Sequence, residues 1–224
     1  MTSPNRRSFL YGLTGVGLLA ARGASEAIAA TQQTTPDPLL NPPANLPVPV
    51  DDGACRHLSG LAVPAVKLRS TKDRWVDLSA PSPSRLVVYC YPRTGRPGQA
   101  ISKSWDDIPG ARGCTPETCA FRDHHKDLQK LGAEVYGFST QDTDYQKEMV
   151  ERLKVPFEVL SDADFAFVRA LRLPTFDFEG VTLVKRLTLV ISRQHIEKVF
   201  YPVFPTDKHA TEVMDWLREH PQRG

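Results

Sequence analysis

The chain has 224 residues, with 28 Lys or Arg and 26 Asp or Glu, and a formal net charge of +2 at pH 7. Residues 1–29 have the character of a leader that holds three of the basic and one of the acidic side chains, so its removal leaves 25 of each. A chain with neither net charge nor a basic stripe is not expected to bind nucleic acid. Its length allows one packed domain with additional segments.

The leader has the pattern of a bacterial export signal. Arg6 and Arg7 stand ahead of an apolar run over residues 9–21, and Ala-Ile-Ala at 27–29 offers a small-residue cleavage site. The run is too short to span a bilayer, and the paired arginines followed by Ser-Phe-Leu resemble a twin-arginine signal, with the general secretory route left open. We therefore expect cleavage after residue 29, no stable membrane insertion afterwards, and a periplasmic or extracellular protein.

A proline-rich segment precedes the predicted domain. Residues 30–50 contain six prolines and no periodic apolar pattern, which predicts an extended linker. The domain itself is expected over residues 51–224, and it opens with short strands at 65–68 and 74–78 that form a hairpin. The apolar run 85–91 then predicts a central strand buried on both faces.

A long loop separates this strand from the next helix. The 21 residues 93–113 are rich in Gly, Pro and charge, which is typical of a functional or mobile loop, and Trp105 suggests a short helical turn at 104–108. We expect the following helix to take Thr115 as its cap and Pro116 as its first position, and to end at Gly132.

Strands and helices alternate through the rest of the chain. This order, closed by a hairpin and a last helix, predicts an α/β fold, a thioredoxin-like three-layer sandwich around a central mixed sheet. The expected strands are 133–139, 157–160, 185–192 and 196–201, and the expected helices are 143–153 with Thr143 as cap, 163–171 and 207–219.

Cysteine placement points to redox chemistry. Cys114 stands at the start of a predicted helix, where the helix dipole favours a thiolate over a thiol, and Cys119 follows five residues later. Arg186, near the start of a strand, is our candidate for the group that holds the thiolate and polarises a substrate. Cys55 and Cys90 are expected to be either a structural disulfide or two buried free thiols.

These residues resemble the peroxiredoxin family, most closely its bacterioferritin-comigratory or Q type. The resemblance extends over about residues 53–220, and it rests on the order of several motifs. The motifs are YCYP at 89–92, GCTPETCAFRD at 113–123, GFST at 137–140, LSDAD at 160–164, RLTLVI at 186–191 and Trp216-Leu217 in the closing helix.

The resemblance implies an antioxidant thiol-dependent peroxidase that needs neither a metal nor an organic cofactor. Cys114 would be the peroxidatic nucleophile, Arg186 would contact the thiolate and the peroxide, and Cys119 would resolve the Cys114 sulfenic acid as an intramolecular disulfide. A thioredoxin-like protein would then reduce the disulfide. We expect a monomer or a weak dimer.

The chain departs from the family pattern at the loop. The matching proline, Pro92, lies 22 residues before Cys114 rather than seven, so about 15 residues are inserted. Ala111 stands three residues before Cys114, where the family has a threonine that bonds the peroxide. We expect either that Thr94 or Thr115 supplies a hydroxyl instead, or that the backbone amides around Cys114 suffice. The loop 93–113 is expected to cover or edge the site.

Two other functions use the same residue types. An exported copper chaperone would combine the cysteines with His124, His125 or His195, but two helical positions five residues apart point about 140° away from each other. A thiol–disulfide oxidoreductase has two residues between its cysteines, whereas here there are four. A purely structural disulfide is the remaining alternative.

Overall fold

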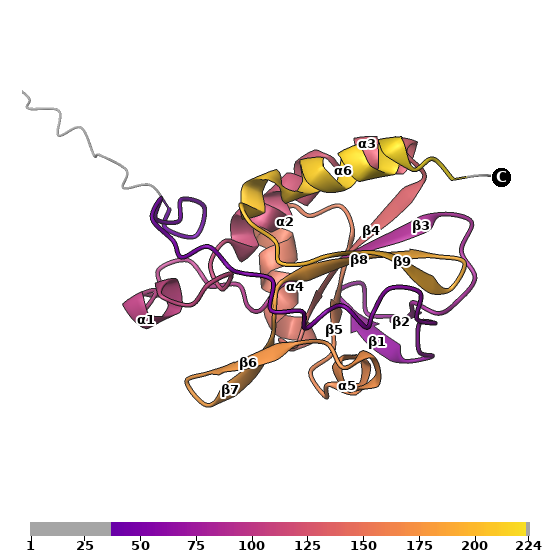
Figure 1. Ribbon diagram of the computed structural model, residues 1–224. Coiled ribbons are helices and arrows are strands. Elements are labelled where there is room, and N and C mark those ends of the chain that lie inside the picture. Colours follow the sequence, from indigo (N-terminus) through magenta and orange to yellow (C-terminus); the bar gives the residue numbers. More distant parts are fainter. Residues whose placement is uncertain (1–36, 223–224) are drawn as a thin grey trace, which may run out of the picture. The chain divides into compact units, whose positions relative to one another are not determined.

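A seven-stranded mixed sheet forms the centre of the protein in the computed structural model, which describes residues 37–222 (Figure 1). The predicted leader and the first part of the linker lie outside the described residues. The strand order is β2-β1-β5-β4-β3-β8-β9. The strands are β1 (Lys67–Ser70), β2 (Trp75–Asp77), β3 (Arg85–Cys90), β4 (Ala133–Ser139), β5 (Glu158–Ser161), β8 (Leu187–Ser192) and β9 (His195–Phe200).

Strand β3 lies in the interior of this sheet, between β4 and β8, as its apolar run predicts. It runs parallel to β4 and antiparallel to β8, and all six of its residues are buried. Because alternate side chains point to opposite faces, Val87 and Tyr89 join one core cluster while Leu86 and Val88 join the other. The predicted mixed sheet and the predicted hairpin of β1 and β2 are thereby confirmed.

Helices cover the two faces unequally. The face that carries Tyr89 packs against four helices, and the opposite face packs against one helix and the loop that contains Cys55. Figure 1 shows α6 and α3 on one side of the sheet and α5 on the other. The helices are α1 (Lys103–Asp106), α2 (Cys114–Asp123), α3 (His125–Lys130), α4 (Thr143–Leu153), α5 (Ala166–Leu171) and α6 (His209–Glu219), the last preceded by a short 3-10 turn, η1 (Thr206–Lys208).

The predicted helix caps are wrong in two places. Gly113, in the left-handed conformation with φ of 99°, is the N-cap of α2, so Thr115 and Pro116 lie inside its first turn rather than at its start. Asp142, not Thr143, caps α4, and its Oδ1 accepts a hydrogen bond of 2.7 Å from the Tyr145 amide. The long helix expected up to Gly132 is broken at His124 into α2 and α3.

A second, two-stranded sheet was not predicted. Strands β6 (Thr175–Phe178) and β7 (Val181–Val184) pair antiparallel across the two-residue turn Glu179-Gly180. Both turn residues have positive φ, 50° and 78°, as a type I′ hairpin requires. Glutamate rarely adopts positive φ, so the sequence pattern does not predict this turn.

A third apolar cluster connects this hairpin to the inserted loop. Trp105, in the predicted helical turn α1, packs against Phe178 and Leu183 of the hairpin and against Ala111. Its ring centroid lies 4.9 Å from that of Phe178. The inserted loop is therefore a folded part of the domain with a small core of its own.

The described end of the linker lies on the domain although it has no helix or strand. Leu39 is buried, and the Arg112 guanidinium donates a 3.0 Å hydrogen bond to the Pro38 carbonyl. From Asp37 onward, then, the linker packs beside the inserted loop. Between residues 37 and 222 no helix is both long enough and apolar enough for a membrane span.

Candidate active site

Cys114 begins helix α2 beyond the carboxyl end of β3, where functional groups of open α/β sheets gather. Gly113 makes this placement possible, because its positive φ turns the chain into the helix and it has no side chain. A Cβ at this position would collide with the side chain of Thr206 in η1. Cys114 is 4% exposed, and its Sγ lies 3.6 Å from the Ala111 carbonyl oxygen.

The Arg186 side chain, 1% exposed, joins Cys114 to the inserted loop. Its Nη2 lies 3.0 Å from the Cys114 Sγ, so the contact expected between these two residues is present. Its Nε and Nη2 donate hydrogen bonds of 3.2 Å to three consecutive carbonyl groups, those of Gly110, Ala111 and Arg112. One guanidinium thus fixes both the Cys114 thiol and the backbone just before it.

Glu117 completes a buried cluster of charges. Its Oε2 accepts a hydrogen bond from Arg186 Nη1, and its side chain is fully buried. Burial opposes the charge of Arg186, yet the attraction of Cys114 and Glu117 raises the pKa of the guanidinium above its usual value. Burial also raises the pKa of Glu117, and the attraction of Arg186 and His209 offsets this only in part.

Sequence reasoning missed Glu117. A usable signal was its spacing, because residues three apart share a helix face, so an acidic side chain at 117 lies beside a thiol at 114. Its Oε1 has no hydrogen-bond partner among the described residues. Glu117 therefore depends on Arg186 for its stability in the core.

Another buried polar pair lies behind Glu117 and was also missed. His209, the first residue of α6, places its Nε2 2.8 Å from Thr188 Oγ1 and its Nδ1 3.0 Å from Glu212 Oε2. Its ring packs edge-on against Phe121 of α2 and Phe200 of β9. Thr188 belongs to β8, which begins directly after Arg186, so the pair attaches α6 to this strand.

Cys119 lies in the same unbroken helix as Cys114. It is half-buried, burial raises the pKa of its thiol, and Arg122 offsets this only in part. Neither cysteine is in a disulfide. Cys55 and Cys90 are buried free thiols in the core cluster on the other side of the sheet, which corresponds to one of the two expectations for them.

A cavity of about 310 Å³ opens in front of Cys114. Ten of its seventeen lining residues belong to the loop 93–113, so the insertion does edge the site as expected. Both Thr94 and Thr115 line the cavity. Thr94 is held in place because its amide donates a 2.9 Å hydrogen bond to Gln141 Oε1 and its carbonyl accepts one of 3.0 Å from the Tyr145 hydroxyl.

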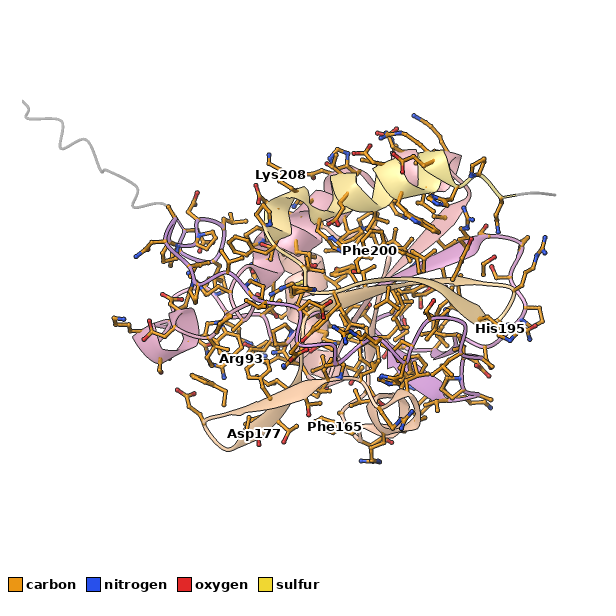
Figure 2. All side chains as sticks on the ribbon, viewed as in Figure 1. Arg93, Phe165, Asp177, His195, Phe200 and Lys208 are labelled. Carbon is orange, nitrogen blue, oxygen red and sulfur yellow. The ribbon has the colours of Figure 1, made fainter. Side chains whose placement is uncertain are left out.

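The histidines considered for a copper site do not come together with the cysteines. His195 begins β9, and Figure 2 shows it at the β8–β9 turn, well away from Arg93 at the cavity. His124 and His125 lie at the junction of α2 and α3. Within the described part of the chain no three His, Cys, Asp or Glu side chains are grouped as metal ligands would be.

A family model and curated relatives both match this chain to the peroxiredoxins. The AhpC/TSA family model matches residues 108–199. Peroxiredoxin Q of Oryza sativa subsp. japonica, a chloroplastic protein, is 33% identical over 198 residues, which cover 86% of this chain and 80% of that protein.

Two solved structures agree with this match. Peroxidoxin BcpB of Mycobacterium tuberculosis is 26% identical with a TM-score of 0.59, over 74% of this chain and 99% of that one. Peroxiredoxin Q of Xanthomonas campestris has the same fold, with a TM-score of 0.58 and 24% identity over 72% of this chain and 98% of that one. The chain belongs to the peroxiredoxin family, to its Q or bacterioferritin-comigratory type, and is a thiol-dependent peroxidase.

Proposed function

We propose that Cys114 is the peroxidatic nucleophile of this peroxidase, with Arg186 as the residue that activates it. The observation that carries this proposal is the 3.0 Å contact between a fully buried guanidinium and the Sγ of Cys114, a residue that lines an open cavity. A positive charge that cannot be solvated stabilises a thiolate beside it, and the start of α2 adds to this effect.

The reaction follows from this arrangement. The Cys114 thiolate attacks the terminal oxygen of a hydroperoxide, the O–O bond breaks, and the leaving oxygen takes up a proton as an alcohol or water. Arg186 stabilises the negative charge that develops on the leaving oxygen. Cys114 is left as a sulfenic acid.

Cys119 is proposed as the resolving residue. Its thiol displaces water from the sulfenic acid and forms an intramolecular disulfide with Cys114, which a thioredoxin-like dithiol protein then reduces by exchange. Thr94 and Thr115 both line the cavity. We propose that one of their hydroxyl groups bonds the peroxide, because Ala111 stands where the family has a threonine for this purpose.

Substitution at the nucleophile and at the arginine tests the proposal. The protein from residue 30 onward, supplied with thioredoxin, its reductase and NADPH, should consume hydrogen peroxide. Cys114→Ser should abolish consumption, and Arg186→Lys should lower the rate about 100-fold because a compact ammonium cannot make the forked contacts. Arg169→Lys, at an exposed position on α5, serves as control. Full activity of Cys114→Ser would show that another residue performs the chemistry.

Thiol reactivity should differ sharply among the four cysteines. Burial raises the pKa of Cys55 to about 12 and also raises the pKa of Cys90 and of Cys119. A thiol with a raised pKa stays protonated, and hence unreactive, until the pH approaches that value. With limiting iodoacetamide at about pH 7.5, peptide mass spectrometry should therefore find Cys114 modified first. Equal labelling of Cys119 would contradict the proposed activation of Cys114.

Disulfide formation should require helix α2 to unwind. Residues five apart in a regular helix have Cα atoms about 8–9 Å apart, whereas a disulfide needs about 7 Å or less and facing side chains. Oxidation of the reduced protein should therefore remove hydrogen-exchange protection from the backbone amides of residues 117–123. The protection of the amides in α3 should change less. The Cys119→Ser variant is the control and should keep its protection. Protection that is unchanged in the oxidised wild type would rule out Cys119 as the resolving residue.

We also propose that residues 1–29 direct export and are removed, leaving a linker and the domain from residue 51. The plant relatives are named as chloroplastic, which fits a targeted protein in general rather than one bacterial route. Expression in a bacterium with a twin-arginine system should give a periplasmic protein that begins at Ala30. Replacement of both Arg6 and Arg7 by lysine should block this, and unaffected export would point to the general secretory route.

A further inference from the structure

The described part of the linker contacts both chain segments that carry the site residues. Together with the first two residues of the domain it forms a strap, residues 37–52, that lies ahead of the family match at residues 108–199. Figure 1 shows the strap in indigo, running from the region of α1 toward β1. The strap contains no helix or strand, so its place on the domain is fixed by its side chains and by a few hydrogen bonds.

The first end of the strap holds both ends of the inserted loop. Leu39 is 7% exposed and lies so close to Gly95 that a Cβ on this glycine would come within 2.7 Å of Leu39 Cδ2. The Pro38 carbonyl accepts a 3.0 Å hydrogen bond from Arg112, whose guanidinium also pairs with Asp106 at 2.8 Å. Leu39 is thus a buried apolar anchor, and the burial of a leucine side chain contributes substantially to the stability of a contact.

The second end of the strap is bonded to the residue just before Arg186. Asp52 accepts hydrogen bonds of 2.8 Å from Lys185 Nζ and from the Tyr201 hydroxyl. Lys185 and Asp52 are both partly exposed, so this ion pair is the weaker of the two attachments. The strap therefore depends mainly on its first end.

The middle of the strap is loosely packed. Val48 and Val50 are 61% and 81% exposed, and a second cavity, of about 320 Å³, lies between this part of the strap and residues 108–110 of the inserted loop. A segment with few buried contacts can leave the surface at a low free-energy cost, without unfolding the core. The strap has this property between its two ends.

Two contacts connect the strap to the Cys114 thiol. Arg112, which bonds the strap through its side chain, accepts a 3.2 Å hydrogen bond from Arg186 Nη2 at its own carbonyl, and the same Nη2 lies 3.0 Å from Cys114 Sγ. Unwinding of α2 from its start would move Arg112 and break these bonds. A contact that exists only in the wound state shifts the equilibrium toward that state by its own free energy.

We infer that the strap is a conformational device that opposes the unwinding of α2 and thereby sets the fate of oxidised Cys114. This inference rests on the proposed roles of Cys114 and Cys119. The sulfenic acid of Cys114 can react with the Cys119 thiol, which releases water and forms the disulfide. Alternatively, a second hydrogen peroxide oxidises it to a sulfinic acid and is itself reduced to water. Only the disulfide requires unwinding, so a bound strap favours the sulfinic acid and a released strap favours the disulfide.

A change at the buried anchor tests the inference in the protein from residue 30 onward. Leu39→Ser removes the apolar contact without adding a charge. During turnover with thioredoxin, its reductase and NADPH, peptide mass spectrometry gives the fraction of turnovers that end in sulfinic acid on Cys114. The hydrogen peroxide concentration that produces a given fraction should be about tenfold higher for Leu39→Ser than for wild type, as the loss of a buried leucine contact would give.

This fraction describes the fate of one intermediate, so a general change in the rate of the first oxidation cancels. The control Val50→Ser makes a comparable change at an exposed position of the strap and should behave as wild type. Arg112→Gln breaks the other contact of the first end and should act in the same direction as Leu39→Ser. Its own control is Lys103→Gln, which removes an exposed cation from the same loop and should have no effect.

Hydrogen exchange on the reduced protein gives a readout that does not depend on activity. In Leu39→Ser, the backbone amides of residues 117–123 should exchange about tenfold faster than in wild type, because α2 unwinds more often. The amides of β3 and β4, in the central sheet, should keep their protection, which shows that the domain remains folded.

The possible failures are distinguishable. An unchanged sulfinic acid fraction in both Leu39→Ser and Arg112→Gln, or unchanged protection of α2 in both, would overturn the inference alone. More sulfinic acid in either variant would overturn it as well. Wild type that forms no disulfide between Cys114 and Cys119 would instead overturn the proposed function.

Discussion

The site depends on one buried positive charge. Arg186 directs its guanidinium at Cys114 Sγ, at the Glu117 carboxylate and at three successive carbonyl groups of the inserted loop. A buried charge is tolerated only when it is paired and hydrogen-bonded, and removing one partner of such a pair typically costs about 3–5 kcal/mol. Arg186 therefore supports the local fold as well as the proposed chemistry, because the same side chain that holds the loop also holds Cys114, the proposed nucleophile.

This arrangement explains how the chain accommodates its insertion. The 21-residue loop 93–113, which lies ahead of α2, would be expected to loosen the start of the helix. Instead, Trp105 anchors the middle of the loop on the β6–β7 hairpin, and Arg186 fixes its last residues through their carbonyl groups. The insertion thereby lines the cavity in front of Cys114, while Cys114 stays at the end of the sheet.

Local patterns predicted most helices and strands, and the motif order predicted the contact between Arg186 and Cys114. The apolar run of β3 and the spacing of α4 are properties of short segments, so they can be found from sequence. Glu117 was missed because its role depends on a residue 69 positions away. The Gly113 cap and the Glu179-Gly180 turn were missed because both depend on positive φ angles that the tertiary structure supports.

The central claim is that Cys114, held by Arg186, is the residue that a peroxide oxidises. It is tested most directly in the Cys119→Ser variant, where a sulfenic acid cannot be resolved by its proposed partner. The reduced variant is treated with one equivalent of hydrogen peroxide and trapped with dimedone, and the adducts are located by peptide mass spectrometry. The account predicts one adduct, on Cys114, whereas an adduct on Cys55 or Cys90 with Cys114 unmodified would contradict it.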